Sequence, residues 1–172
     1  MMAILKKIER AILGVESFIL IAVGITLPSI VVLGVIFRYI LKTDLFGIEE
    51  IEIFMAICLY FVGGAYASYL RTQITADLVQ SLVKSFAVRK FFGILACGLS
   101  VVALVAFTYW TIDLVDYAWL RKPRTPAWKI PLVVEYIVVL ISFVLMTIYA
   151  FRDLWLAIVR KPETASPSLE QS

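Results

Sequence analysis

Long apolar segments alternate with short polar ones along the whole chain. Four segments of 16 to 22 residues carry no charge, and these are residues 17–37, 53–70, 91–112 and 136–151. A helix needs roughly 20 mainly apolar residues to cross a hydrocarbon core of about 30 Å. The four segments are continuous and lack the alternation of barrel strands. The pattern therefore predicts an all-α integral membrane protein with four transmembrane helices.

Polar residues and helix breakers set the ends of the predicted elements. We expect one membrane domain over residues 1–162, with spans at about 12–40, 49–70, 91–112 and 130–151. Apolar residues recur at helical spacing among polar ones over residues 76–90, which predicts an amphipathic helix at the membrane interface. A short amphipathic continuation is expected over 154–159. The polar tail over 163–172 is expected to be disordered.

Composition and charge narrow the possible functions. Hydrophobic residues make up 62% of the 172 positions and charged residues 17%, which excludes an ordinary soluble domain. The formal net charge is +3, and the basic residues lie at the ends of apolar segments, which indicates membrane anchoring rather than nucleic-acid binding. The chain has no histidine, and its two cysteines, Cys58 and Cys97, lie inside apolar segments. We therefore expect no metal or other cofactor.

Basic residues are distributed unevenly over the polar segments. Ten lie in the two termini and in the segment between the second and third spans, whereas six lie in the other two loops. Because basic residues favour the cytoplasmic side of a membrane, both termini are expected in the cytoplasm.

Charged residues flank the loop between the first two spans. Glu49 and Glu50 fall in the first turn of the second span, where the helix dipole favours carboxylates. Arg38 ends the first span on the same side of the membrane, so it could form an ion pair with either carboxylate. An equally simple interpretation is that these charges only cap two helices.

Small residues recur four positions apart in the second span, namely Gly63 with Ala67 and Gly64 with Ser68. Small residues at this spacing let another helix approach closely in lipid. Such patterns are common in membrane bundles, so they predict helix packing without naming the partner.

The third apolar segment continues into a mixed acidic and aromatic stretch. Asp113 and Asp116 share one helix face there. The surrounding Tyr and Trp side chains predict an aromatic belt at the membrane boundary.

The uncharged spans lack the ionisable residues that mark most transport paths. Glu16 and Glu135 come nearest, and both lie close to helix ends. The spans also lack a nucleophile with a base in reach. The chain is therefore predicted to be a scaffold for another protein and not an enzyme.

Five short motifs resemble one family in their order and spacing. They are Phe37-Arg38-Tyr39, Glu49-Glu50, Gly63-Gly64-Ala65, Gln73-Ile74-Thr75-Ala76-Asp77 and Ile130-Pro131. Over residues 8–159 the chain resembles the small membrane subunit of tripartite ATP-independent periplasmic (TRAP) transporters, the DctQ/SiaQ-like proteins. The family commonly has a histidine where this chain has Gln73, and often a tryptophan before the acidic pair. The family-motif positions are Arg38, Tyr39, Glu50, Gln73, Asp77 and Pro131.

The resemblance implies a complex in the bacterial inner membrane. Its other parts would be a large sodium-coupled membrane subunit (DctM/SiaM-like) and a soluble periplasmic binding protein (DctP/SiaP-like), with lipid around them. Such systems import organic acids, and similarity to the SiaQ branch favours sialic acid (N-acetylneuraminate). The basic residues around the second periplasmic loop would then help to dock the binding protein, and these are Arg121, Lys122, Arg124 and Lys129.

Three other interpretations stay open. A four-helix membrane enzyme or redox protein would need cysteine pairs or histidines that the chain lacks. A small self-assembling channel or exporter would need an intramembrane carboxylate. A structural membrane protein of some other complex would share every feature except the family motifs.

Overall fold

The four apolar segments each lie within a long helix. A computed structural model of the chain describes residues 2–43, 46–70 and 86–159. Its helices are α1 (Met2–Tyr39), α2 (Ile48–Leu70), α4 (Phe86–Arg121) and α5 (Val133–Val159). All four are long and apolar enough to cross a membrane, and the described residues form no strand. The predicted all-α membrane fold is therefore confirmed.

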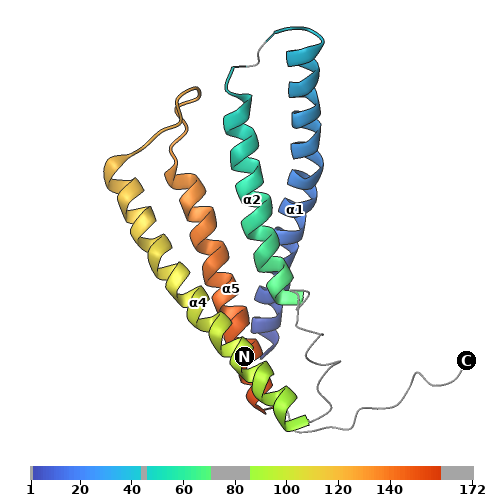
Figure 1. The fold of residues 1–172 in the computed structure, drawn as a ribbon, viewed down its shortest axis with the longest axis vertical. Coiled ribbons are helices and arrows are strands. Elements are labelled where there is room, and N and C mark those ends of the chain that lie inside the picture. The colour runs from blue at the N-terminus through green and yellow to red at the C-terminus, as the bar shows by residue number, and fades with distance from the viewer. Residues whose placement is uncertain (1, 44–45, 71–85, 160–172) are drawn as a thin grey trace, which may run out of the picture.

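The helices stand side by side in a single row. Helix α1 packs on α2, α2 packs on α5, and α5 packs on α4 (Figure 1). The last helix of the chain thus lies between the second and the third. Residues 40–43, 46–47 and 122–132 lie at one end of the row, which we call the loop end. The opposite end, where α1 begins and α5 ends, is the terminal end (Figure 1).

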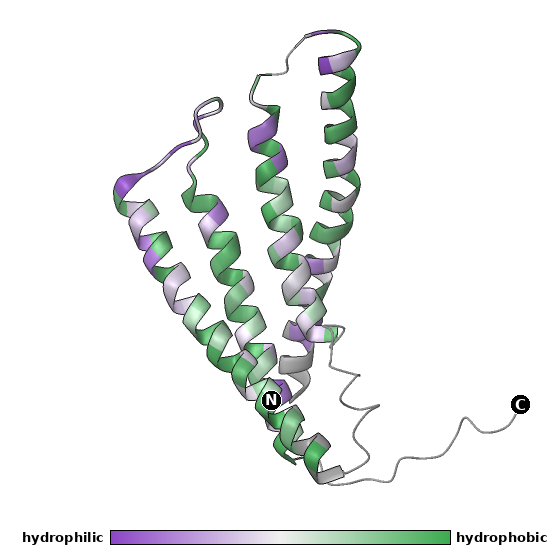
Figure 2. Ribbon diagram, in the orientation of Figure 1, coloured by the Kyte–Doolittle hydropathy of each residue, from purple (hydrophilic) through white to green (hydrophobic). Residues whose placement is uncertain are grey.

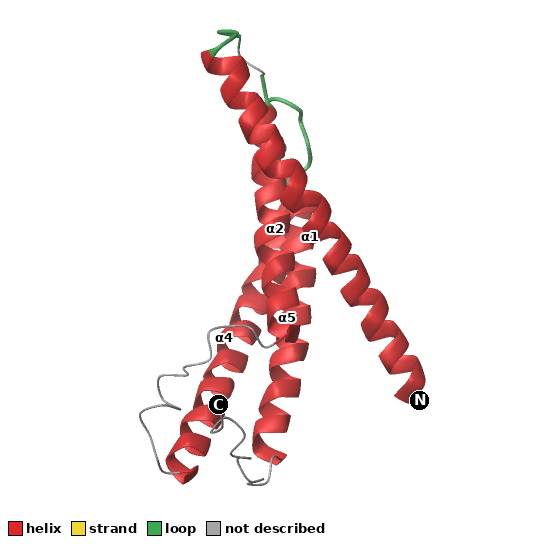
Figure 3. Ribbon diagram, turned by 90° about the vertical axis from the view of Figure 1, so that its right-hand side faces the viewer, coloured by secondary structure: helices red, strands yellow, loops and turns green. Residues whose placement is uncertain are grey.

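The row has two broad apolar faces. Apolar side chains cover most of the helix surfaces, and polar residues gather near the helix ends (Figure 2). The first half of α1 leans away from the other three helices, as the turned view shows (Figure 3). Exposed apolar side chains are therefore a general property of this chain when it is taken alone.

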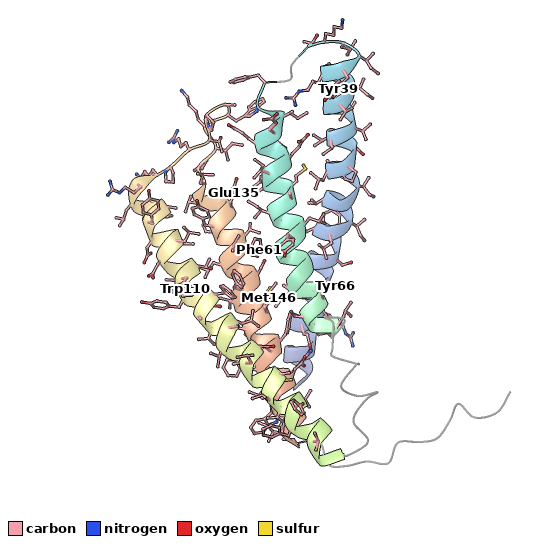
Figure 4. The ribbon with its side chains drawn as sticks, in the orientation of Figure 1. Tyr39, Phe61, Tyr66, Trp110, Glu135 and Met146 are labelled. Atoms are coloured by element: carbon pink, nitrogen blue, oxygen red, sulfur yellow. The ribbon has the colours of Figure 1, made fainter. Side chains whose placement is uncertain are left out.

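Small and aromatic residues determine how closely the central helices pack. A Cβ atom at Gly64 would collide with Cε of Met146 on α5, so a larger residue would force the Met146 side chain to move. Phe61 of α2 and Phe143 of α5 form an edge-to-face pair with ring centroids 5.5 Å apart. Phe61 and Met146 both lie at the α2–α5 contact (Figure 4). These contacts join α2 and α5, the two inner helices of the row.

Some predicted elements fall on residues that the structure does not describe. Most of the interfacial helix expected over 76–90 is among them, and only 86–90 are described, as the start of α4. The tail over 163–172 and the motif positions Gln73 and Asp77 also lie outside the described residues. These expectations stay predictions.

Candidate functional site

Arg38 and Glu49 form an ion pair across the first hairpin. Nη2 of Arg38 donates a hydrogen bond of 2.9 Å to Oε1 of Glu49. Both side chains are more than half exposed, so water screens the pair, and exposed pairs contribute only about 0.2–1 kcal/mol. The next residue, Tyr39, is exposed at the end of α1 (Figure 4).

Glu50 contacts a different part of the chain. Its Oε1 accepts a hydrogen bond from the backbone N–H of Ala127 at 2.6 Å, and its Oε2 accepts one from Trp128 at 3.0 Å. A carboxylate that bonds two backbone amides forms charge-assisted bonds, which are the stronger kind. The first turn of α2 is thereby attached to the loop between α4 and α5.

Gly47 also contacts the loop between α4 and α5, through the side chain of Trp128. Nε1 of Trp128 donates a hydrogen bond of 3.1 Å to the Gly47 carbonyl. Gly47 has φ +83°, and a Cβ there would lie within 2.5–2.7 Å of atoms of Ala127 and Trp128. Only glycine tolerates both conditions. We call Gly47, Glu50, Ala127 and Trp128 the loop clasp.

The loop between α4 and α5 has its own internal order. The Thr125 N–H donates to the Ile130 carbonyl at 3.0 Å, and the Ile130 N–H donates to Oγ1 of Thr125 at 3.0 Å. Pro131 lies beside Arg124 in an isolated antiparallel bridge. This local pairing holds the backbone amides that Glu50 binds.

Four exposed basic side chains surround this loop. We call Arg121, Lys122, Arg124 and Lys129 the cationic loop, and each of them is exposed. Lys122 and Lys129 have φ of 48° and 53°, the left-handed conformation that helps the backbone to turn. Lys122 and Arg124 also line a shallow pocket of about 280 Å³ together with Trp119. The arrangement can bind an anionic group from the aqueous phase.

The predicted small residues pack within the chain itself. Gly63 faces α1, where a Cβ would lie 3.5 Å from Cδ2 of Leu20, and Gly64 faces α5. Ser68 donates a hydrogen bond of 2.9 Å to the Gly64 carbonyl. Ala67 and Ser68 are half-buried. The small-residue pattern thus serves the chain's own helices.

The terminal end holds a contact that sequence analysis missed. Nη2 of Arg152 donates to the Tyr69 carbonyl at 3.1 Å, and Nη1 lies 3.8 Å from Oε1 of Glu9. The guanidinium also lies over the Tyr69 and Tyr149 rings, 5.0 and 5.5 Å from their centroids. Arg152 therefore joins α1, α2 and α5. Its position after an uncharged run looks like that of any terminal charge, so the sequence carried no signal.

Two carboxyl side chains are buried although sequence analysis placed them only near helix ends. Glu16 is 4% exposed, and neither of its oxygens has a hydrogen-bond partner among the described residues. Glu135 is 6% exposed and lies in the first turn of α5 (Figure 4). In the part of the chain that the structure describes, no group of three or more His, Cys, Asp or Glu could hold a metal ion.

These features define a class of protein. Four membrane-spanning helices stand in one row. Polar contacts join α1, α2 and the loop between α4 and α5 at the loop end, and α1, α2 and α5 at the terminal end. The chain is a multi-pass membrane protein, and the polar contacts described above join its helices and loops to one another.

Comparison with known families then identifies it. The family model for the DctQ component of tripartite ATP-independent periplasmic transporters matches residues 27–160, so the chain belongs to this family. It is the small subunit of a TRAP transporter of the bacterial inner membrane and not an enzyme. The family implies a large DctM subunit and a periplasmic binding protein as partners. A search of curated proteins finds no match.

Proposed function

We propose that this subunit is the fixed scaffold of a sodium-coupled transporter that imports an organic acid, with sialic acid as the favoured substrate. The observation that carries the scaffold role is the loop clasp, because Glu50 joins the first turn of α2 to the loop between α4 and α5, which is far away in the sequence. Arg152 makes a corresponding junction at the terminal end. A subunit joined at both ends is suited to stay rigid while a partner moves.

The preference for sialic acid rests on similarity to the SiaQ branch of the family. The binding pocket and the ion sites would lie in the partner proteins. Uptake of labelled sialic acid by proteoliposomes that contain this chain, the large subunit and the binding protein tests the substrate. Uptake should need an inward sodium gradient, and accumulation without one would contradict sodium coupling.

The orientation follows from the distribution of basic residues. With both termini in the cytoplasm, the loop end faces the periplasm. The cationic loop would then lie on the side where the binding protein approaches. Its four exposed charges are suited to meet acidic side chains on that protein, and Glu50 holds the loop in place through the Ala127 and Trp128 amides.

Reversal of the loop charges tests this docking role. We expect the quadruple variant R121E/K122E/R124E/K129E to lower uptake several-fold at low salt, mainly by slowing association with the binding protein. The effect should shrink as salt rises, because the Debye length falls to about 8 Å at 0.15 M.

The matched control exchanges the same residues without changing charge, as R121K/K122R/R124K/K129R. This variant should keep wild-type uptake. Equal uptake by the charge-reversed variant and the control at low salt would contradict docking through the cationic loop.

A further inference from the structure

Charged residues near the ends of α1, α2 and α5 mark the same position of the bilayer along these three helices. At the loop end, the charges of α1 and α2 meet in the Arg38–Glu49 pair. At the terminal end, Arg152 of α5 binds the Tyr69 carbonyl near the end of α2. The uncharged runs of α1, α2 and α5 therefore lie side by side between these two levels.

Helix α4 is displaced along its axis relative to this level. The hydroxyls of Thr108 on α4 and Thr147 on α5 lie 3.1 Å apart and give the register of the antiparallel pair. From Thr147 the uncharged run of α5 continues to Tyr136, about 16.5 Å toward the loop end at about 1.5 Å per residue. Asp113 lies only about 7.5 Å from Thr108 in that direction, and Asp116 about 12 Å. Both aspartates therefore lie beside the uncharged run of α5.

These aspartates point away from the rest of the chain. The side of α4 that packs on α5 includes Thr111 and Ala118, which are buried. The opposite side is exposed and combines aromatic, acidic and apolar residues at helical spacing. We call it the acidic-aromatic face, and it consists of Tyr109, Asp113, Asp116, Tyr117 and Leu120.

The upper part of α4 is also more polar than the neighbouring part of α5. Hydrophilic positions interrupt the upper part of α4, whereas the neighbouring stretch of α5 is largely hydrophobic (Figure 2). Trp110 extends from the outer side of α4 beside this face and is 62% exposed (Figure 4). No ion pair among the described residues involves Asp113 or Asp116.

Lipid is a poor environment for this face. Carboxylates at hydrocarbon depth are expensive, and those that occur face protein or water-filled space and pair with other groups. Tyr side chains are enriched at protein interfaces, where they anchor contacts. We infer that the acidic-aromatic face binds a transmembrane helix of the large subunit, and that this helix presents Arg or Lys side chains to Asp113 and Asp116. The inference rests on the proposed function and adds to it the contact surface and its chemistry.

Co-purification tests the charge complementarity. The tagged chain is extracted from native membranes in mild detergent, and the large subunit that accompanies it is quantified by mass spectrometry. We expect D113K/D116K to lower the recovered large subunit at least tenfold and D113N/D116N to lower it several-fold. The control E163K/E170K changes the net charge as much as D113K/D116K and should recover as much partner as the wild type. Unchanged recovery with both aspartate variants would overturn the inference.

Thiol labelling of the complexes that still assemble gives a second readout. In a background without Cys58 and Cys97, Asp113→Cys and Lys129→Cys are exposed to a membrane-impermeant maleimide from the periplasmic side. We expect rapid labelling at position 129 and protection at position 113 in the complex. Equal labelling would place the face in water and overturn the inference. If the wild-type chain recovers no large subunit, the proposed function fails. If the wild type and both aspartate variants recover it equally, only the inference about the acidic-aromatic face fails.

Discussion

A single carboxylate, Glu50, attaches the loop between α4 and α5 to the start of α2. Sequence analysis identified the acidic pair Glu49-Glu50 and the Arg38 opposite, because their spacing across a short hairpin limits where they can lie. It could not assign Glu50, whose hydrogen-bond partners Ala127 and Trp128 lie 77 and 78 positions away in the chain. Only the packing of α2 on α5 brings them together, and no local pattern encodes that contact.

Substitution of Glu50 by glutamine should weaken the loop clasp. The side chain keeps its shape, but one oxygen is replaced by an NH₂ group that faces a backbone N–H and cannot accept its hydrogen bond. We expect the melting temperature of the purified subunit to fall by several degrees. Glu49→Gln is the matched control, and it should shift the melting temperature by about one or two degrees, because exposed ion pairs contribute little. Equal shifts for both variants would contradict the clasp.

At the scale of the helices, continuous apolar runs made the spans predictable. A run of about 20 apolar residues has few alternatives to a membrane helix. The order of the row was not predictable, since placing α5 between α2 and α4 depends on side-chain fit. Gly64 illustrates the limit, because its sequence context predicted close helix packing and only the structure shows Met146 as the neighbour.

Enlarging Gly64 should disturb the α2–α5 contact. Gly64→Val places branched carbons where Met146 now lies, and overpacking of this kind typically costs about 1–3 kcal/mol. Thermal unfolding in detergent measures the effect. The control Gly98→Val adds the same side chain at a position with no neighbour within 4 Å, so it should have a much smaller effect.

A second substitution makes the Gly64 test specific. Met146→Ala removes the group that the new valine side chain would meet, so the double variant should regain part of the lost stability. If Met146→Ala lowers the stability of the Gly64→Val variant further, the collision does not account for the effect.

At the scale of the whole molecule, the row of helices is open on both faces. A soluble protein would bury such surfaces, but in a membrane they can meet lipid or another subunit. The joined ends suit the proposed scaffold role. Hydropathy alone could assign neither the proposed docking surface for the binding protein nor the proposed face toward the large subunit, because hydropathy describes lipid and protein contacts alike.

The most direct test of the scaffold role is the composition of the native complex. The chain carries a carboxyl-terminal tag, is purified from its own membranes in mild detergent, and its companions are quantified by mass spectrometry. We expect one large polytopic membrane protein in roughly equal amount, and sodium-driven uptake when that pair is reconstituted with its binding protein. Recovery of the chain alone as a stable homo-oligomer, with transport activity of its own, would contradict the scaffold role.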